Sequence, residues 1–285
     1  MADRAGFGDR LVEAVRASTP LCVGVDPSSA LLGSWGLDDS ADGVERMGRT
    51  VVEAVVGTAA AIKPQVAYFE RHGTRGYAAL EAVIAAAREA GILVVADAKR
   101  GDIDATMTAY GEAWLSDASP LAVDALTVSA YLGLAAMEQV MKMASGSGRG
   151  LFAVVASSNP EGRSLQEART AAGQRVEEEL LAELSARNEA EVAATGRGLG
   201  SFGAVVGATR TAGSLPLGGL HGPFLVPGVG AQGATANDVG ALFSRCPEGS
   251  VLVNASRSIL AAGPSAAEVA RAARELGDEL RSALP

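Results

Sequence analysis

The chain has 285 residues and a formal net charge of −9, with 48% hydrophobic and 4% aromatic residues. A chain of this length and composition can bury a sizeable core, so a folded globular protein is expected. The acidic balance without a basic run argues against nucleic acid or an anionic membrane surface as the main partner, and the scarcity of aromatic residues argues against base-stacking platforms.

Short apolar runs rich in Val, Ile and Leu recur along the chain. They are continuous rather than alternating, which is typical of strands that are buried on both faces. We therefore expect eight strands, at Leu21–Asp26, Ala59–Lys63, Ile92–Asp97, Ala122–Ser129, Leu151–Ser157, Phe202–Thr209, Pro223–Gly228 and Ser250–Ser256.

Amphipathic, Ala-rich segments such as Thr74–Gly91 and Ala266–Leu284 separate these strands and read as helices. Eight strands alternating with helices predict an α/β fold, a single-domain (β/α)8 TIM barrel over residues 1–285. An open doubly wound sheet is the alternative, but no G-x-G-x-x-G follows the first strand. The longest interval, Glu161–Gly200, reads as an elaborated crossover helix and has no motif that indicates a role.

Neither of the two cysteines, Cys22 and Cys246, belongs to a Cys-x-x-Cys pair, so two reduced thiols and no zinc site are expected. The first residues lack the apolar region of a signal peptide, and no apolar run reaches about 18 residues. We therefore expect a cytoplasmic protein with no membrane segment.

Polar residues follow most of the predicted strands. Asp26 ends the first, Lys63 the second and Asp97 the third, and two serines, Ser157 and Ser158, follow the fifth. The segments PGVGAQG and NASRS follow the seventh and eighth strands. Each could be a turn or a helix cap taken alone, but a barrel brings its carboxyl-terminal strand ends together at the face that carries active sites.

The third strand runs into the charged segment DAKRGD. Asp97 and Lys99 should share a face because side chains i and i+2 of a strand point the same way. Asp102 could cap a following helix, with Thr106 one turn on. Two neighbouring carboxylates would favour the ammonium form of Lys99, and an ammonium fixed in a cleft suits an acid that gives a proton to a carbanion.

The other end of the predicted cleft suits a phosphate. The Gly-rich PGVGAQG loop allows backbone N–H groups to approach an anion, Gln232 can donate an amide hydrogen, and Arg257 can make a bidentate contact. Arg210, after the sixth strand, could add positive charge nearby. The histidines, His72 and His221, are expected to be loop residues and not ligands.

Taken together, these segments resemble the orotidine 5′-phosphate decarboxylase family. The match consists of D-x-K-x-x-D from Asp97 with Thr106 beyond it, together with GVDP at Gly24–Pro27, IKPQ at Ile62–Gln65, the PGVGAQG loop and Arg257. The resemblance extends from about Leu21 to Leu260. The segment KPQVAYFERHG looks like the longer branch of the family that is typical of actinobacteria.

The resemblance implies that orotidine 5′-monophosphate loses CO₂ to give UMP, the last step of pyrimidine synthesis, without metal or cofactor. Lys99 would protonate C6 of the pyrimidine, and Asp97 would hold Lys99 and lie near the substrate carboxylate. In the family, the second Asp and the Thr come from the partner subunit. Asp102 and Thr106 would therefore complete the neighbouring site of a homodimer.

The resemblance also implies how the substrate is bound. Asp26 and Lys63 would bind ribose hydroxyls. A serine after the fifth strand would read the pyrimidine edge, and of the two available we favour Ser158. Gln232 and Arg257 would hold the phosphate.

Two other functions stay open at this point. A related barrel decarboxylates a 3-keto sugar acid phosphate with Mg²⁺, and an aldolase cousin exists, but the metal there needs a carboxylate at the second strand, where this chain has Lys63. A phosphate-binding sensor without catalysis would keep Gln232 and Arg257 but would have no use for Asp97, Lys99 and Asp102 together.

Overall fold

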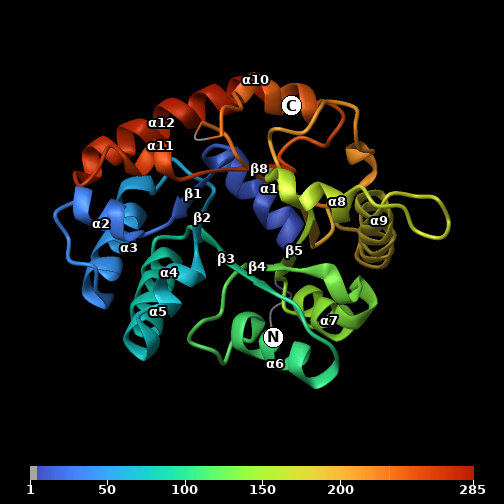
Figure 1. Ribbon diagram of the computed structural model, residues 1–285, viewed down its shortest axis with the longest axis horizontal. Helices are drawn as coiled ribbons and strands as arrows, with labels where there is room; N and C mark the ends of the chain where they lie inside the picture. Colours follow the sequence, from blue (N-terminus) through green and yellow to red (C-terminus); the bar gives the residue numbers. More distant parts are fainter. Residues whose placement is uncertain (1–4, 231) are drawn as a thin grey trace.

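Eight parallel strands close into a barrel in chain order, with β8 paired to β1 (Figure 1). The computed structural model describes residues 5–230 and 232–285. The barrel confirms the predicted fold class, and each strand overlaps the apolar run expected for it. The strands are β1 Leu21–Val25, β2 Ala61–Pro64, β3 Leu93–Arg100, β4 Ala125–Val128, β5 Gly150–Ala156, β6 Phe202–Val206, β7 Phe224–Pro227 and β8 Val251–Ala255.

Helices surround the barrel, and those expected at Thr74–Gly91 and Ala266–Leu284 are α5 and α12 (Figure 1). In the described residues no helix is both long and apolar enough to cross a membrane. The helices are α1 Phe7–Ala17, α2 Ser29–Ser34, α3 Ala41–Val55, α4 Val66–Glu70, α5 Gly73–Glu89, α6 Asp104–Leu115, α7 Glu138–Gly146, α8 Arg163–Gln166, α9 Val176–Thr195, α10 Ala236–Leu242, α11 Arg257–Leu260 and α12 Ala266–Ala283. Short 3-10 helices are η1 Ala130–Leu132, η2 Leu134–Met137, η3 Pro160–Gly162 and η4 Leu217–Gly219.

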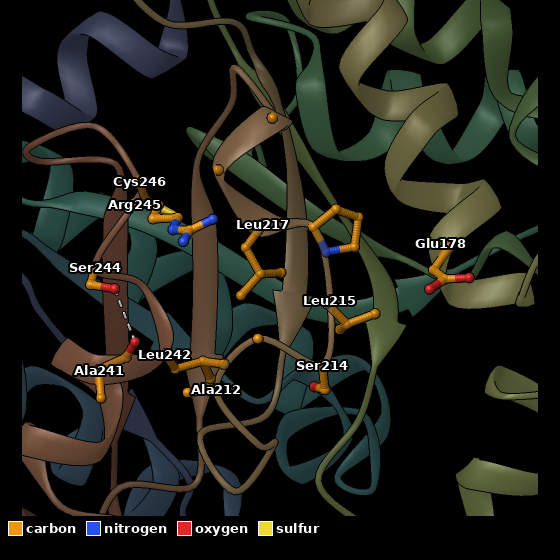
Figure 2. Close-up of a pocket in the computed structure, with 14 residues that line it drawn as sticks. Glu178, Ala212, Ser214, Leu215, Leu217, Ala241, Leu242, Ser244, Arg245 and Cys246 are labelled. Carbon is orange, nitrogen blue, oxygen red and sulfur yellow. Dashed lines mark hydrogen bonds between the residues drawn. The ribbon is translucent and has the colours of Figure 1, made fainter.

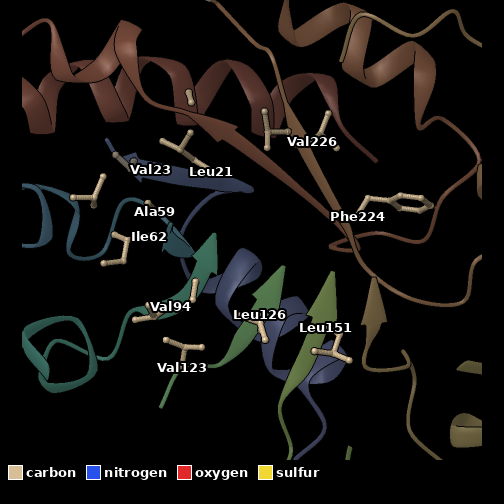
Figure 3. Close-up of a cluster of buried hydrophobic side chains, with 14 of the residues drawn as sticks. Leu21, Val23, Ala59, Ile62, Val94, Val123, Leu126, Leu151, Phe224 and Val226 are labelled. Atoms are coloured by element: carbon tan, nitrogen blue, oxygen red, sulfur yellow. The ribbon is translucent and has the colours of Figure 1, made fainter. Parts of the chain in front are cut away.

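The main core lies between the strands and the outer helices. Alternate strand residues such as Leu21, Val23, Ile62, Val94 and Val226 are buried in it (Figure 3), as the two-residue period of a strand requires. Full burial of each such side chain contributes about 1.5–3 kcal/mol to folding. The continuous apolar runs of the sequence therefore reflect strands covered on both faces.

The interior of the barrel forms a second apolar cluster, which α1 closes. Phe7 and Leu11 of α1 are fully buried in this cluster with Cys22, Val95 and Phe152. The ring of Phe7 meets that of Phe152 edge to face, with 5.7 Å between centroids. Because α1 fills the amino-terminal end of the barrel, a cleft for ligands is left at the carboxyl-terminal ends of the strands.

Candidate active site

Strand β3 carries the charged segment out of the barrel. It runs to Arg100, three residues beyond the expected end at Asp97. Its pairing with β4 shifts register between Ala96 and Arg100, and Lys99 has a φ of +47°. This left-handed conformation is unfavourable for a residue with a long side chain. Such strain is frequent at functional sites, where the surrounding contacts maintain it.

Three charged side chains from two strands meet at this point. Lys63 donates to Asp97 Oδ2 at 2.7 Å, and Lys99 donates to Asp97 Oδ1 at 2.5 Å. Lys63 and Asp97 are buried, whereas half of the Lys99 side chain is exposed. The contact between Lys99 and Asp97 confirms that the two side chains point the same way.

Burial and neighbouring charges have opposite effects on the pKa values of Asp97 and Lys63. Burial alone would raise the pKa of Asp97, but the charges and hydrogen bonds of Lys63 and Lys99 outweigh it and lower this pKa to about 2. Burial would lower the pKa of Lys63, yet Asp97 and Asp26 produce a net rise. Asp97 is therefore a carboxylate and Lys63 an ammonium at neutral pH.

A cleft of about 280 Å³ opens above these charges. Most of the candidate residues of the sequence analysis line it, from strand ends that are distant in the chain. These candidates are Asp26, Lys63, Asp97, Lys99, Ser157, Ser158, Gln232 and Arg257.

The two serines after β5 differ in their contacts. Ser157 is tied to Gln166, which donates to Ser157 Oγ at 2.8 Å and accepts from the Ser157 backbone N–H at 3.1 Å. Gln166 ends α8, in the long crossover after β5. This arrangement uses the hydroxyl of Ser157 within the loop, whereas the described residues provide no side-chain hydrogen bond for Ser158.

The Gly-rich loop after β7 turns back on itself. Gly228, Gly230 and Gly233 all have positive φ, which glycine adopts without steric cost. The Gly230 N–H donates to Ala234 O and the Gly233 N–H to Gly230 O, both at 2.9 Å. These two N–H groups are used within the loop, and the expectation that other N–H groups of the loop approach an anion stays a prediction. Gln232 lies in the same loop at the rim of the cleft.

Asp102 and Thr106 do not line the cleft of their own chain. The prediction that Asp102 caps the next helix is wrong. Helix α6 begins two residues later, because Ile103 is extended (φ −112°, ψ 159°), and Asp102 accepts instead from the backbone N–H of Ile103 at 2.8 Å. Thr106 is exposed on the first turns of α6. Neither residue therefore contributes to the cleft of its own chain.

Arg210 does not reach the cleft either. It donates to both carboxylate oxygens of Glu177 at 2.6 and 2.7 Å and to Glu167 at 3.1 Å. The sequence alone could not show that this arginine pairs with a buried carboxylate, that of Glu177. His221 lies 3.4 Å from Glu189, and His72 lies 3.5 Å from Asp39.

Several cleft residues were missed by the sequence analysis. Gln65, Thr127, Asn254 and Ser256 also line the cleft. Asn254 Oδ1, Ser256 Oγ and Asp26 Oδ1 are buried and have no hydrogen-bond partner within residues 5–230 and 232–285, a costly state that a bound polar ligand would relieve. The NASRS and IKPQ segments contained three of these residues, but Thr127 lies in a strand that showed no polar end.

A larger hollow, of about 930 Å³, lies outside the barrel (Figure 2). It exists because only the short helix η4 stands between β6 and β7, which leaves a gap in the outer layer of helices. Leu215, Leu217 and Leu242 line it, with Glu178 and Arg245 near its edges. The candidate site residues are all elsewhere, so we assign the chemistry to the smaller cleft.

Comparison with known proteins agrees with this cleft. The model of the orotidine 5′-phosphate decarboxylase / HUMPS family matches residues 19–273. The chain is 47% identical to the orotidine 5′-phosphate decarboxylase of Streptomyces coelicolor and 48% identical to that of Salinispora arenicola, and each alignment covers 98% of both proteins. These relatives are actinobacterial, as the segment KPQVAYFERHG indicated.

Solved structures show the same relationship. A crystal structure from Streptomyces avermitilis superposes with a TM-score of 0.92 at 47% identity and covers 98% of this chain and 96% of its own. The OMP decarboxylase of Leishmania donovani superposes with a TM-score of 0.75 at 28% identity, over 97% and 98% of the two chains. The chain therefore belongs to the orotidine 5′-phosphate decarboxylase family of carboxy-lyases.

Proposed function

We propose that the cleft converts orotidine 5′-monophosphate to UMP and CO₂, with Lys99 as the acid that protonates C6 of the pyrimidine. The observation that carries this proposal is the group in which buried Lys63 and half-exposed Lys99 contact opposite oxygens of the buried Asp97 carboxylate. Asp97, with a pKa of about 2, remains an anion beside Lys99. The cleft thus holds the Lys99 amine next to a fixed carboxylate.

The reaction requires one bond to break and one to form. As the bond between C6 and the carboxylate breaks, CO₂ leaves and its bonding electrons stay on C6, which takes a proton from the Lys99 ammonium. The positive charges of Lys63 and Lys99 stabilise the negative charge that develops on the ring. Asp97 fixes Lys99 and lies beside the carboxylate that leaves. Lys99 lies at the end of β3, and its Nζ is 2.5 Å from Asp97 Oδ1, which places it to act as the proton donor.

The remaining cleft residues are assigned to binding. Asp26, with its unpartnered Oδ1, and Lys63 bind the ribose hydroxyls. Ser158 reads the pyrimidine edge, since Gln166 occupies the hydroxyl of Ser157. Gln232 and Arg257, at the rim, hold the phosphate, and Arg257 supplies positive charge against the net charge of −9 of the whole chain.

A second copy of the chain completes the site in this proposal. Asp102 and Thr106 lie outside the cleft of their own chain. Beside them, Ile103, Tyr131 and Leu132 are exposed. The backbone hydrogen bond from Ser129 N to Arg100 O joins the loops that carry these apolar residues. An exposed apolar group of this kind indicates a protein interface, and a twofold dimer would bring Asp102 and Thr106 to the neighbouring cleft.

We also propose that the protein acts in the cytoplasm, in pyrimidine biosynthesis. Cys22 and Cys246 are both free and buried, and burial raises the pKa of each thiol to about 12. Free thiols of this kind are compatible with a reducing compartment.

The test is the decrease in ultraviolet absorbance of orotidine 5′-monophosphate with purified protein in the presence of EDTA. The wild-type chain should turn over without added metal, Lys99→Ala should lose activity, and Lys142→Ala, an exposed lysine of α7, should retain it. Turnover that requires Mg²⁺ would favour the sugar-phosphate chemistry. Binding of UMP without any turnover would favour a sensor.

A further inference from the structure

Thr127 lies between the two residues to which the proposed function assigns the chemistry. Its side chain is buried at the end of β4, with 1% exposed. The hydroxyl donates to Asp97 Oδ1 at 3.0 Å and accepts from the Lys99 backbone N–H at 2.9 Å. One hydroxyl thus connects the carboxylate of one residue with the main chain of the other.

The irregular pairing of β3 with β4 explains why a hydroxyl is needed at this position. Ala96 pairs with Leu126 and Arg100 pairs with Val128, so three residues of β3 face Thr127 alone. A bulge of this kind leaves backbone groups without their ladder partners. The hydroxyl of Thr127 takes the place of a β4 carbonyl as the acceptor for the Lys99 N–H.

The bulge sets the direction of the proton donor. Lys99 has a φ of +47°, a conformation that a lysine keeps only when its surroundings hold it there. In this conformation Nζ of Lys99 is 2.5 Å from Asp97 Oδ1, the oxygen to which Thr127 also donates. Without the hydroxyl, a backbone N–H and a buried carboxylate oxygen would each lose a partner, and both would favour a different arrangement.

We propose that Thr127 is a positioning residue, which holds the β3 bulge and the Asp97 carboxylate so that the Lys99 ammonium points at the reacting carbon. This inference rests on the proposed role of Lys99 as proton donor. It assigns no substrate contact to Thr127. The loss of its hydroxyl should therefore slow the chemical step and leave the binding of ribose and phosphate unchanged.

Three variants test the inference. Thr127→Val keeps the shape and removes the hydroxyl, and it should lower kcat by about tenfold to a hundredfold, the range expected for a misplaced reacting group. KM for the substrate and Kd for UMP should stay within about twofold, since binding groups are untouched. Thr127→Ser, which retains the hydroxyl, should restore most of kcat. Thr50→Val removes a comparable hydroxyl from helix α3, where it donates to Arg46 O, and should leave kcat unchanged.

A crystal structure of Thr127→Val supplies a readout that does not depend on turnover. Lys99 should leave the positive-φ region, or the contact between Lys99 Nζ and Asp97 should open. A wild-type kcat in Thr127→Val, or an unaltered bulge, would overturn the inference. If Thr127→Val does not fold, Thr127→Ser and Thr127→Ala are compared instead. A decrease in kcat that is as large in Thr127→Ser as in Thr127→Ala would show that Thr127 has a packing role. A wild-type protein without turnover would contradict the proposed function, and the crystal structure would still decide the role of Thr127.

Discussion

Asp97 receives hydrogen bonds from Lys63, Lys99 and Thr127, and its negative charge explains how two lysine side chains can lie in one cleft. Removing one partner of a buried ion pair leaves an uncompensated charge, which costs more than the pair contributes. Asp97 therefore has a structural effect in addition to the chemical role proposed for it. A variant at this position should change stability and activity together, and pH separates the two effects.

The pKa of Asp97 predicts how stability depends on pH. It falls from an ordinary value of 3.8 to about 2 in the folded protein, so ionisation of Asp97 stabilises the fold above about pH 4. This contribution, about 2 kcal/mol, should be lost as pH falls from about 4 towards 2. Urea unfolding of the wild type and Asp97→Asn at several pH values measures it.

The difference in the free energy of unfolding between these two proteins should be largest near neutral pH and shrink below pH 4. Asp278→Asn is the control, because that carboxylate is exposed on α12. A difference that stays constant down to the acid limit of folding would contradict the lowered pKa.

How far single residues can be predicted depends on what makes them functional. Asp26, Lys63, Asp97 and Lys99 were recognisable because charged groups at the ends of buried strands are uncommon. Thr127 was not, because a threonine in a strand is ordinary and its role arises from a bulge in the neighbouring strand. The prediction that Arg210 lies near the phosphate is wrong for a related reason, since its partner Glu177 is 33 residues away in sequence.

At the scale of elements, the contact between Arg210 and Glu177 joins helix α9 to the loop after β6. Glu177, in the first turn of α9, is fully buried and also lies 2.9 Å from Arg175. Burial raises the pKa of Glu177 although both guanidinium groups act to lower it. This ion-pair group anchors the start of α9, within the crossover that follows Ser157 and Ser158.

Glu177→Ala should therefore destabilise the protein by about 3–5 kcal/mol, because it leaves Arg210 buried without its main partner. Glu275→Ala, which breaks an exposed ion pair with Arg271 in α12, should cost less than about 1 kcal/mol. Denaturant unfolding of both variants measures this contrast. Equal losses would show that the buried pair has no special role.

The order and type of the elements were predictable, and their irregularities were not. Continuous apolar runs predict buried parallel strands whatever the details of their ends. The extension of β3 to Arg100 depends on contacts with β4, such as the hydrogen bond that the Lys99 N–H donates to Thr127 Oγ1. Between β6 and β7 the chain forms only the short helix η4, which contacts α9. Both are tertiary effects that local sequence patterns do not contain.

At the scale of the whole molecule, the two ends of the barrel differ. Helix α1 fills one end with Phe7 and Leu11, and the other end holds the cleft. The exposed residues Ile103, Tyr131 and Leu132 lie on loops of this second end. An interface there would place the polar residues of one chain close to the cleft of another, so catalysis and assembly would depend on the same surface.

Mixed dimers test this arrangement directly. Lys99→Ala and Asp102→Ala should each be inactive alone, because every cleft then lacks one of the two groups. A dimer with one chain of each kind has one cleft that lacks both and one that is intact, so it should show about half of the wild-type activity. Co-expression with two affinity tags isolates these mixed dimers for assay.

The control pairs Lys99→Ala with Asp97→Ala. Lys99 contacts Asp97 within one protomer, so the proposed mechanism uses both residues in the cleft of their own chain. Each cleft of that mixed dimer then lacks one group and should stay inactive. Activity in the first mixture without activity in the control would place Asp102 in the neighbouring cleft. Inactivity of both mixtures would show that Asp102 acts within its own chain. In that case the Asp102 side chain would have to leave its hydrogen bond with the Ile103 N–H to reach the cleft.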